Sequence, residues 1–324
     1  MPNVMFIIQE KLQSIKMKKL LWILVLGLVL TFSSNGISGE MNVFKKKIKL
    51  PKDVAQGYKN AWKFCCNYDP ETRLTPDYAF KIVNKSDGHP VRLGEQAIRF
   101  EVRRGDCGLS PGGYDDCKHY SERHELNAIK EVNKLKGVTW HTYSLYLPKD
   151  FPFDGFDFIG MGQFHTEESE PAFNWSVEAW GYELQRRTAC NLPENKKKDC
   201  DARDPQNYRK VVIYPADLLG QWHDMVFNGK WSVKQDGYFK QWINGKLVYH
   251  YEGSNLTPGE LSGFQFGIYI HPLSYSPKKA NVGYYDEIRF AKKSCKKLKL
   301  EDLGYNCKDL ESQTVSRIDK IKGK

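Results

Sequence analysis

The chain has 324 residues, of which 40% are hydrophobic and 13% aromatic, and it carries a formal net charge of +10. This content of core-forming residues excludes an intrinsically disordered chain, and the length allows one large all-β domain or two ordinary domains. The positive charge favours a polyanionic partner such as an acidic polysaccharide, a nucleic acid or an anionic envelope. A merely soluble basic surface is the alternative.

The N-terminal segment has the layout of a secretory signal peptide. Two lysines precede an uninterrupted apolar stretch from Leu20 to Leu30, and small and polar residues follow. We therefore expect residues 1–39 to be removed, although the true start is open between Met1 and Met17. The mature protein is then secreted or periplasmic, without a stable membrane anchor. A retained anchor is the alternative, but the apolar stretch is short for a membrane span.

Export favours disulfide bonds over metal thiolates for the eight cysteines. Six of them form three local pairs, namely Cys107 with Cys117, Cys190 with Cys200, and Cys295 with Cys307. The partners of the adjacent Cys65 and Cys66 stay open. The chain contains neither a CxxC nor an HExxH motif, so we expect no cofactor and no zinc site, while a structural calcium ion stays open.

Short alternating segments run from residue 97 to residue 291. The first, AIRFEVR at 97–103, places apolar residues on one face and charged residues on the other, as a half-buried strand does. Asn244-Gly245 separates two later segments and is a strong hairpin signal. The segment FNWSVEAWGYEL reads as one further strand. Many short strands joined by turns predict an all-β sandwich or jelly roll.

One segment disagrees with this pattern. SERHELNAIKEVNKLKG, at 121–137, has Leu126, Ile129, Val132 and Leu135 at threefold spacing, which fits a helix. We expect its start to be a strand, with the helix as the alternative.

Two of the expected strands carry an unusual polar face. In MGQFH, Gln163 and His165 share one side of an extended chain and Phe164 takes the other. In GFQFGIYIHP the same alternation aligns Gln265, Tyr269 and His271 opposite a row of apolar residues. We expect the two strands to line one groove, with an ordinary solvated sheet face as the alternative.

Glutamine, histidine and tyrosine groups in a basic groove suit β-elimination on a uronic-acid polymer. The proton beside the uronate carboxylate becomes removable only when the carboxylate charge is neutralised, which glutamine and arginine donors can do. A histidine or tyrosine then takes the proton, and the other returns one to the departing glycosidic oxygen.

These motifs also resemble those of a known family. QFH resembles the Gln-x-His motif of alginate lyases, SERHEL their Arg-x-Glu-Leu strand, and FQFGIYIHP their C-terminal strand motif. The surrounding sequence, over roughly residues 55–292, is similar to the heparin lyase I-like polysaccharide lyases, a group that includes glucuronan lyases. The resemblance implies a concanavalin-like β-jelly roll of two antiparallel sheets with a concave groove, and an acidic polysaccharide as partner rather than nucleic acid.

The resemblance also implies roles for individual residues. His165 and Tyr269 would be the base and acid pair, with their order open, while Gln163 and Arg123 would neutralise the uronate carboxylate. Glu125 would orient Arg123. Such lyases commonly have a lysine four residues before the catalytic tyrosine, where this chain has Gln265, and the missing cation disfavours a highly sulfated substrate. Glucuronan, a related uronan and alginate all stay open.

Further substrate contacts are expected at His271, Lys230 and Asn174, the last with Trp180 on the same strand face as a wall for sugar stacking. For Lys230 an ordinary surface lysine is the alternative. We expect a lyase domain over residues 40–292, a basic C-terminal extension over 293–324, and a monomer.

Two other functions compete with a lyase. A non-catalytic carbohydrate-binding jelly roll needs the groove without the chemistry. A retaining glycoside hydrolase needs two close carboxylates, for which the sequence shows no E-x-D-x-x-E strand.

Overall fold

The computed structural model describes the following residues: 48–58, 62–65, 75–109, 115–128, 133–152, 158–166, 170–187, 208–271, 280–315 and 320–322. The predicted signal peptide at 1–39, the predicted bond between Cys190 and Cys200, and the pairing of Cys65 and Cys66 lie outside this part of the chain. Within the described ranges, no helix has the length and apolar character that a membrane span requires.

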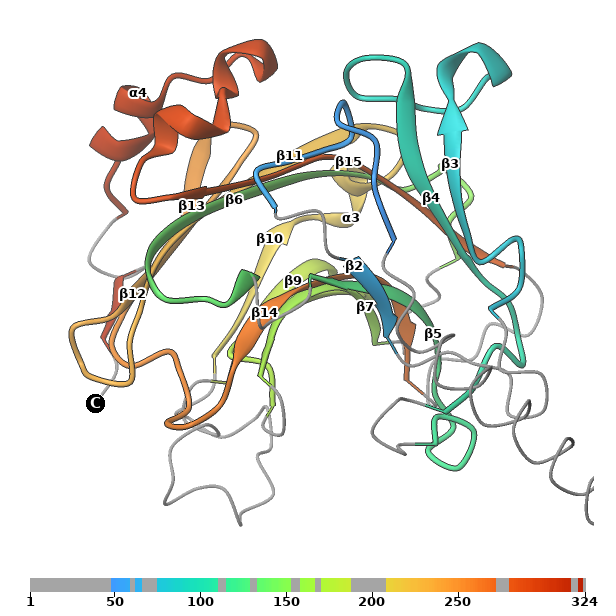
Figure 1. Cartoon of the computed structure of the whole chain (residues 1–324), viewed down its shortest axis with the longest axis horizontal. Coiled ribbons are helices and arrows are strands. Elements are labelled where there is room, and N and C mark those ends of the chain that lie inside the picture. The colour runs from blue at the N-terminus through green and yellow to red at the C-terminus, as the bar shows by residue number, and fades with distance from the viewer. Residues whose placement is uncertain are drawn as a thin grey trace, which may run out of the picture. The chain divides into compact units, whose positions relative to one another are not determined.

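Two stacked sheets form the domain (Figure 1). The nine-stranded sheet has the order β16 (Lys320–Lys322), β13 (Lys246–Glu252), β12 (Tyr238–Ile243), β11 (Trp222–Trp231), β6 (Gly137–Tyr146), β15 (Asn281–Lys292), β4 (Gln96–Val102) and β3 (Phe80–Asn84), with β1 (Ala55–Gln56) also on β15. The seven-stranded sheet has the order β10 (Tyr208–Ile213), β9 (Gly181–Arg186), β8 (Phe173–Glu178), β7 (Ile159–Thr166), β14 (Ser262–Ile270), β5 (Glu122–Ala128) and β2 (Trp62–Cys65).

Every strand pair is antiparallel except those of the two short strands, β1 with β15 and β16 with β13. The predicted sandwich of two antiparallel sheets is therefore confirmed, with these two parallel additions. Figure 1 shows the seven-stranded sheet as an arch whose concave face points away from the nine-stranded sheet. The short helices of the described ranges include 3-10 turns at Lys85–Asp87, Cys295–Leu298 and Leu300–Leu303, and the α-helices α3 (Pro215–Leu218) and α4 (Cys307–Ser312).

The core between the sheets is largely aromatic. Phe164 of β7 is fully buried, and the centre of its ring lies within 6 Å of the centres of five tryptophan and phenylalanine rings. These rings belong to Trp175, Phe227, Trp231, Phe239 and Phe264. Burial of each large apolar side chain stabilises the fold by about 1.5–3 kcal/mol. Because alternate residues of β7 and β14 enter this core, their intervening polar residues must face the concave side.

The local predictions have mixed outcomes. Asn244 and Gly245, with φ angles of 49° and 78°, form the predicted hairpin turn between β12 and β13. The segment at 121–137 begins as strand β5, as expected. The segment FNWSVEAWGYEL was wrongly predicted as one strand, because Glu178 pairs with Gly181 and the chain reverses between them. Trp180 therefore lies in a turn and does not share a strand face with Asn174.

The C-terminal segment packs on the outer face of the nine-stranded sheet (Figure 1). The predicted bond between Cys295 and Cys307 is present, and both cysteines are buried with Trp242 in a second apolar cluster. The indole nitrogen of Trp242 donates to the backbone oxygen of Leu310 (3.1 Å), and the Tyr305 hydroxyl donates to Asp224 (2.6 Å).

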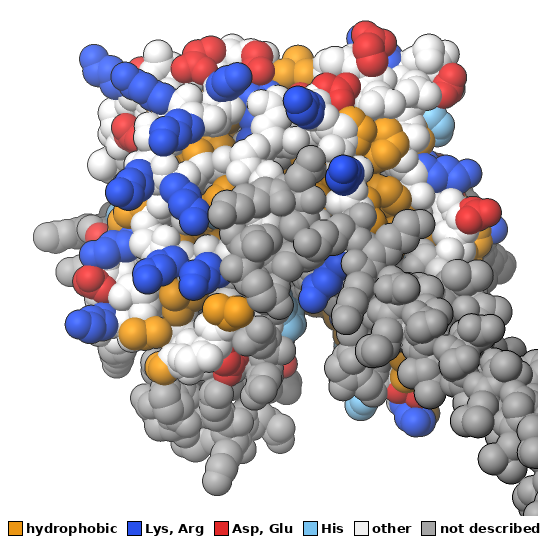
Figure 2. Space-filling model, in the orientation of Figure 1, with side chains coloured by type: hydrophobic (Ala, Val, Ile, Leu, Met, Phe, Trp, Pro, Cys, Tyr) orange, Lys and Arg blue, Asp and Glu red, His pale blue; other side chains and the backbone are white. Residues whose placement is uncertain are grey.

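Many of the Lys and Arg side chains in Figure 2 lie on the side of β12, β13 and this C-terminal segment. The segment contributes the exposed lysines Lys292, Lys293, Lys296, Lys297, Lys299 and Lys308. These lysines place a group of exposed positive charges on the outer side of the sandwich.

Candidate active site

The concave face of the seven-stranded sheet carries the polar residues of the predicted groove. Gln163 of β7 lies opposite Gln265 of β14, and Tyr269 of β14 lies opposite Arg123 of β5. Arg123, Gln163 and Tyr269 are partly exposed, whereas Gln265 is buried. The strands therefore bring four of the predicted site residues to neighbouring positions on one face.

A buried carboxylate, Glu125 of β5, connects these residues. Its side chain is only 1% exposed, and its two oxygens accept hydrogen bonds from the amide nitrogens of Gln163 (3.1 Å) and Gln265 (2.7 Å). It also lies 3.6 Å from the guanidinium of Arg123. Burial raises the pKa of Glu125, while Arg123 and the two amides act in the opposite direction. The expectation that Glu125 orients Arg123 captured only one of its three contacts.

A glycine makes this arrangement possible. Gly267 of β14 pairs directly with Glu125 and has a φ of 140°, in a region that L side chains rarely adopt. A Cβ atom there would lie 2.3 Å from the backbone oxygen of His124. The ladder between β14 and β7 also shifts register between Phe266 and Tyr269. The glycine therefore allows β14 to lie close to the backbone of β5 at Glu125.

Tyr269 is enclosed by two groups from the start of β5. The guanidinium carbon of Arg123 lies 4.2 Å from the centre of the Tyr269 ring, a cation-π contact. The Tyr269 hydroxyl lies 3.2 Å from the hydroxyl of Ser121, which in turn donates to the backbone oxygen of His119 (3.3 Å). Either hydroxyl can be the donor in the contact between Tyr269 and Ser121. Burial raises the pKa of Tyr269, while Arg123 acts to lower it, so the phenol is protonated at neutral pH.

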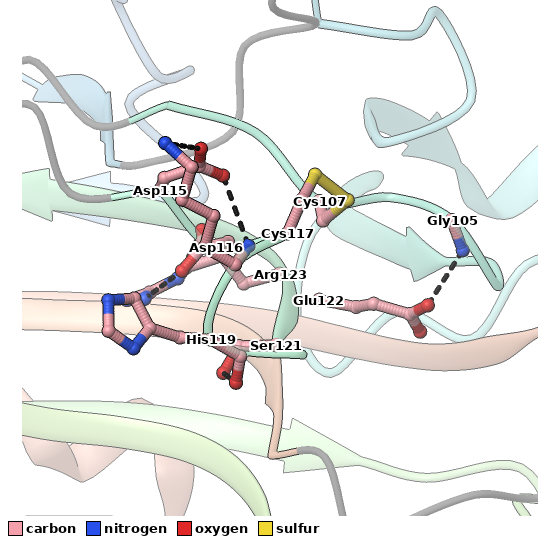
Figure 3. Close-up of a disulfide and its surroundings, with 10 residues drawn as sticks. Gly105, Cys107, Asp115, Asp116, Cys117, His119, Ser121, Glu122 and Arg123 are labelled. Carbon is pink, nitrogen blue, oxygen red and sulfur yellow. Dashed lines mark hydrogen bonds and ion pairs between the residues drawn. A yellow bond between two sulfur atoms is a disulfide. The ribbon is translucent and has the colours of Figure 1, made fainter.

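Asp116 holds Arg123, and it did not emerge from the sequence. Both oxygens of its fully buried carboxylate accept from Arg123, with Nε at 2.9 Å. Figure 3 shows this ion pair beside the Cys107–Cys117 disulfide, which is present as predicted. Burial lowers the pKa of Arg123, but attraction to Glu125 and Asp116 outweighs this and raises it. The sequence feature that could have indicated this role is the position of Asp116 directly before Cys117.

His165 lies on the same face but is not brought together with Tyr269. It pairs with Gly263, whereas Tyr269 pairs with Gly160. Five residues of β7 separate these rows, which is roughly 16 Å between backbone positions at about 3.3 Å per residue. The Tyr269 hydroxyl contacts Ser121, which directly precedes β5. The Gln163–Gln265 pair lies toward the opposite end of β5. The backbone positions of the predicted base and acid pair are therefore well separated along the sheet. The Nδ1 atom of His165 contacts the backbone oxygen of Thr166.

A row of carboxamides crosses five adjacent strands at one register level. Its members are Asn127, Gln265, Gln163, Asn174 and Gln185. The row ends at cationic residues, Lys63 of β2 and Arg209 of β10. Neighbouring strands are about 4.8 Å apart, so this carboxamide row offers one amide per strand. The Oδ1 atoms of Asn127 and Asn174 are buried without a protein hydrogen-bond partner.

The remaining predicted substrate contacts, at Asn174, His271 and Lys230, lie in different parts of the structure. Asn174 belongs to the carboxamide row, and His271 is exposed just after the end of β14. Lys230 was wrongly placed in the groove, because it lies on β11 in the other sheet and pairs with Asp236 at 2.8 Å. In the described ranges, no three histidine, cysteine or acidic side chains gather in a way that could hold a metal ion.

Comparison with known proteins gives the class of the chain. A family model described as "Polysaccharide lyase" matches residues 83–289, which run from β3 into β15 and include the whole concave face except β2. The chain therefore belongs to the polysaccharide lyase family. No curated protein sequence matches it significantly.

Three solved structures of similar architecture are lyases. One is an endo-β-1,4-glucuronan lyase from the fungus Trichoderma reesei (13% identity, TM-score 0.45, covering 71% of this chain and 94% of that chain). The second is a family 7 alginate lyase in complex with its product (14% identity, TM-score 0.45, covering 71% and 94%). The third is an alginate lyase from Chlorella virus (16% identity, TM-score 0.43, covering 71% and 93%).

The role of Gly267 leads to a first prediction. We expect Gly267→Ala to lower the free energy of unfolding by about 2–4 kcal/mol, because it adds a backbone clash to an unfavourable φ. Urea unfolding measures this. Gly259→Ala is the matched control, since Gly259 also has a positive φ but no atom within 4 Å of its Cβ position. Equal losses in the two variants would contradict the close packing of Gly267 against β5.

Proposed function

We propose that this polysaccharide lyase cleaves an unsulfated uronic-acid polysaccharide by β-elimination, with Tyr269 transferring the proton. The observation that carries the proposal is the stack of Arg123 on Tyr269 beside the Glu125-bound pair of glutamines. A cation, amide donors and a phenol are the groups that this reaction requires.

Neutralisation of the uronate carboxylate is assigned to Arg123 and Gln163. The side-chain amide of Gln163 has two N–H groups. One of them donates to Glu125, so the second remains for the substrate. The partial exposure of Arg123 and Gln163 makes both accessible to a sugar ring. Charge that develops on the enolate is then stabilised by donors that are already oriented, which lowers the barrier without reorganisation.

The separation of His165 from Tyr269 supports a one-residue proton transfer. The Tyr269 phenolate takes the C5 proton, the electron pair forms the C4=C5 double bond, and the C4–O bond breaks. The same phenol then returns the proton to the departing oxygen. One residue serves both steps only when proton and leaving group lie on the same side of the ring, as in D-glucuronate and D-mannuronate. We therefore favour glucuronan-like or mannuronate-rich substrates. His165 then binds a neighbouring sugar.

The charges of the concave face support an unsulfated substrate. Arg123 is paired with Asp116, Arg187 with Glu170 and Arg209 with Glu183. These carboxylates neutralise the arginines that would otherwise bind a sulfate group. In addition, Gln265 stands where related lyases carry a lysine. The likeness to the heparin lyase I-like group is consequently one of architecture and reaction, with glucuronan lyases the nearer model for the substrate. Secretion or a periplasmic location, inferred from residues 18–38, completes the proposal.

A non-catalytic glycan-binding module is the second candidate, because the paired arginines and the carboxamide row would also bind a uronan without cleaving it. The contact of Arg123 with the Tyr269 ring, beside the two glutamines bound to Glu125, favours the enzyme.

Product formation separates these possibilities. We expect ultraviolet absorbance from unsaturated products on glucuronan or polymannuronate, with at least tenfold slower release from polyguluronate and heparin. Tyr269→Phe should lower the rate by at least about 1,000-fold, because it removes the proton carrier. Tyr120→Phe is the control, since Tyr120 is 78% exposed. His165→Ala should raise KM with less than tenfold change in kcat. Binding of a uronan with no product would favour the module instead.

The pKa of Tyr269 sets the expected pH profile. Since its pKa is raised above the ordinary value near 10, the phenolate is a minor species that increases about tenfold per pH unit below that pKa. We expect kcat/KM to rise steadily between pH 7 and pH 9.5. A rate that levels off above about pH 7, as for an imidazole base, would overturn the assignment to Tyr269 and restore His165 as the base.

A further inference from the structure

We infer that Asp116, locked in place by the Cys107–Cys117 disulfide, is a positioning residue that sets both partners of Tyr269. This inference rests on the proposed function, because Tyr269 is the group that transfers the proton there. Asp116 itself is buried and does not reach the sugar site. It acts through Arg123 with its side chain and through Ser121 with its backbone.

The side chain of Asp116 fixes the direction of the Arg123 guanidinium. It accepts two hydrogen bonds from Arg123, from Nε at 2.9 Å and from Nη2. A two-point contact between planar groups permits one orientation, and this orientation lays the guanidinium over the Tyr269 ring. The opposing carboxylate, Glu125, is a looser contact at 3.6 Å. Arg123 is thus held from the disulfide side.

The backbone of Asp116 fixes the second partner. Its carbonyl oxygen accepts from the backbone nitrogens of Ser121 (2.9 Å) and His119 (3.1 Å), which closes the turn that leads into β5. The Ser121 hydroxyl, placed by this turn, is the one that meets the Tyr269 hydroxyl. One residue therefore determines the position of the cation over the ring and of the hydroxyl that contacts its oxygen.

The disulfide immobilises this residue from two sides. Asp116 directly precedes Cys117, and its backbone nitrogen donates to Gly108, directly after Cys107 (2.9 Å). The residue directly before Cys107, Asp106, accepts from the backbone nitrogen of Arg123 (3.1 Å). Figure 3 shows Cys107, Cys117, Asp116 and Arg123 in this arrangement. The cross-link thus joins the two chain segments that hold Arg123 by its backbone and by its side chain.

Loss of the Asp116 charge should therefore move Arg123. Removing one member of a buried ion pair leaves the other without compensation. Arg123 retains Glu125 as a counter-charge, so we expect its guanidinium to shift toward Glu125 and away from the Tyr269 ring. A misplacement of about 1 Å in a site that depends on orientation can lower the rate by about 100-fold.

The test compares Asp116→Asn with Asp115→Asn. Asp115 is the adjacent residue, but its carboxylate pairs with Lys118 on the surface and does not contact Arg123. The mature protein is labelled with 13C-tyrosine, and the Tyr269 resonance is identified by its loss in Tyr269→Phe. We expect that resonance to shift in Asp116→Asn and to stay unchanged in Asp115→Asn. An unchanged resonance in folded Asp116→Asn would overturn the inference.

Activity on the preferred uronan provides the second readout. We expect kcat/KM to fall about 10–100-fold in Asp116→Asn, and this loss to disappear when Arg123 is already replaced by alanine, because Asp116 acts through it. Additive losses would indicate a general structural role and refute the inference. If no uronan is cleaved by the wild-type protein, the proposed function fails, while the tyrosine resonance still decides the positioning role.

The disulfide is tested with the paired variant Cys107→Ser and Cys117→Ser, which also serves if Asp116→Asn does not fold. We expect it to shift the Tyr269 resonance in the same direction as Asp116→Asn, with a loss in kcat/KM of at least fivefold. A folded paired variant with wild-type resonance and rate would show that the cross-link does not position the site.

Discussion

The buried carboxylate of Glu125 is the interaction on which the rest of the site depends. A charge removed from water costs several kcal/mol unless donors surround it, so its partners are required by the fold. Here the donors come from three strands, Gln163 on β7, Gln265 on β14 and Arg123 on β5 itself. Satisfying one charge therefore orients three side chains toward the concave face. Such orientation before substrate arrives is what electrostatic catalysis requires.

Two levels of the fold support this carboxylate. Below it, the aromatic core holds β7 and β14 together, because each buries alternate residues against rings such as Phe164 and Phe264. Beside it, Gly267 allows β14 to lie close to the backbone of β5 at Glu125. The Cys107–Cys117 segment then restrains Arg123 from the other side. Packing, backbone conformation and cross-linking thus converge on the same few polar groups.

Much of the fold was readable from the sequence because strand periodicity and turn chemistry are local. The alternation in GFQFGIYIHP correctly separated the core face from the polar face, and Asn244-Gly245 marked a real hairpin. The separation of β8 from β9 was missed, since a two-residue turn with Trp180 interrupts no obvious pattern. Lys230 was misplaced because alternation identifies a face of a strand but not the sheet to which it belongs.

The site itself was only partly predictable, because alternation along a strand does not fix how neighbouring strands align. Which residues face one side follows from the sequence, but their alignment depends on register, and the shift beside Gly267 is set by contacts between distant strands. The distance between His165 and Tyr269 and the multiple contacts of Glu125 therefore emerged only in three dimensions. Asp116 escaped notice because its role comes from a loop that a disulfide closes.

The rate of unsaturated product formation by Glu125→Gln tests the central claim most directly. Glutamine keeps the size of the side chain but offers one acceptor oxygen and no charge, so one glutamine loses its acceptor and Arg123 loses a counter-charge. The account expects a loss of at least about 100-fold on the preferred uronan in a protein that remains folded. A folded variant whose rate stays within twofold of the wild type would contradict it.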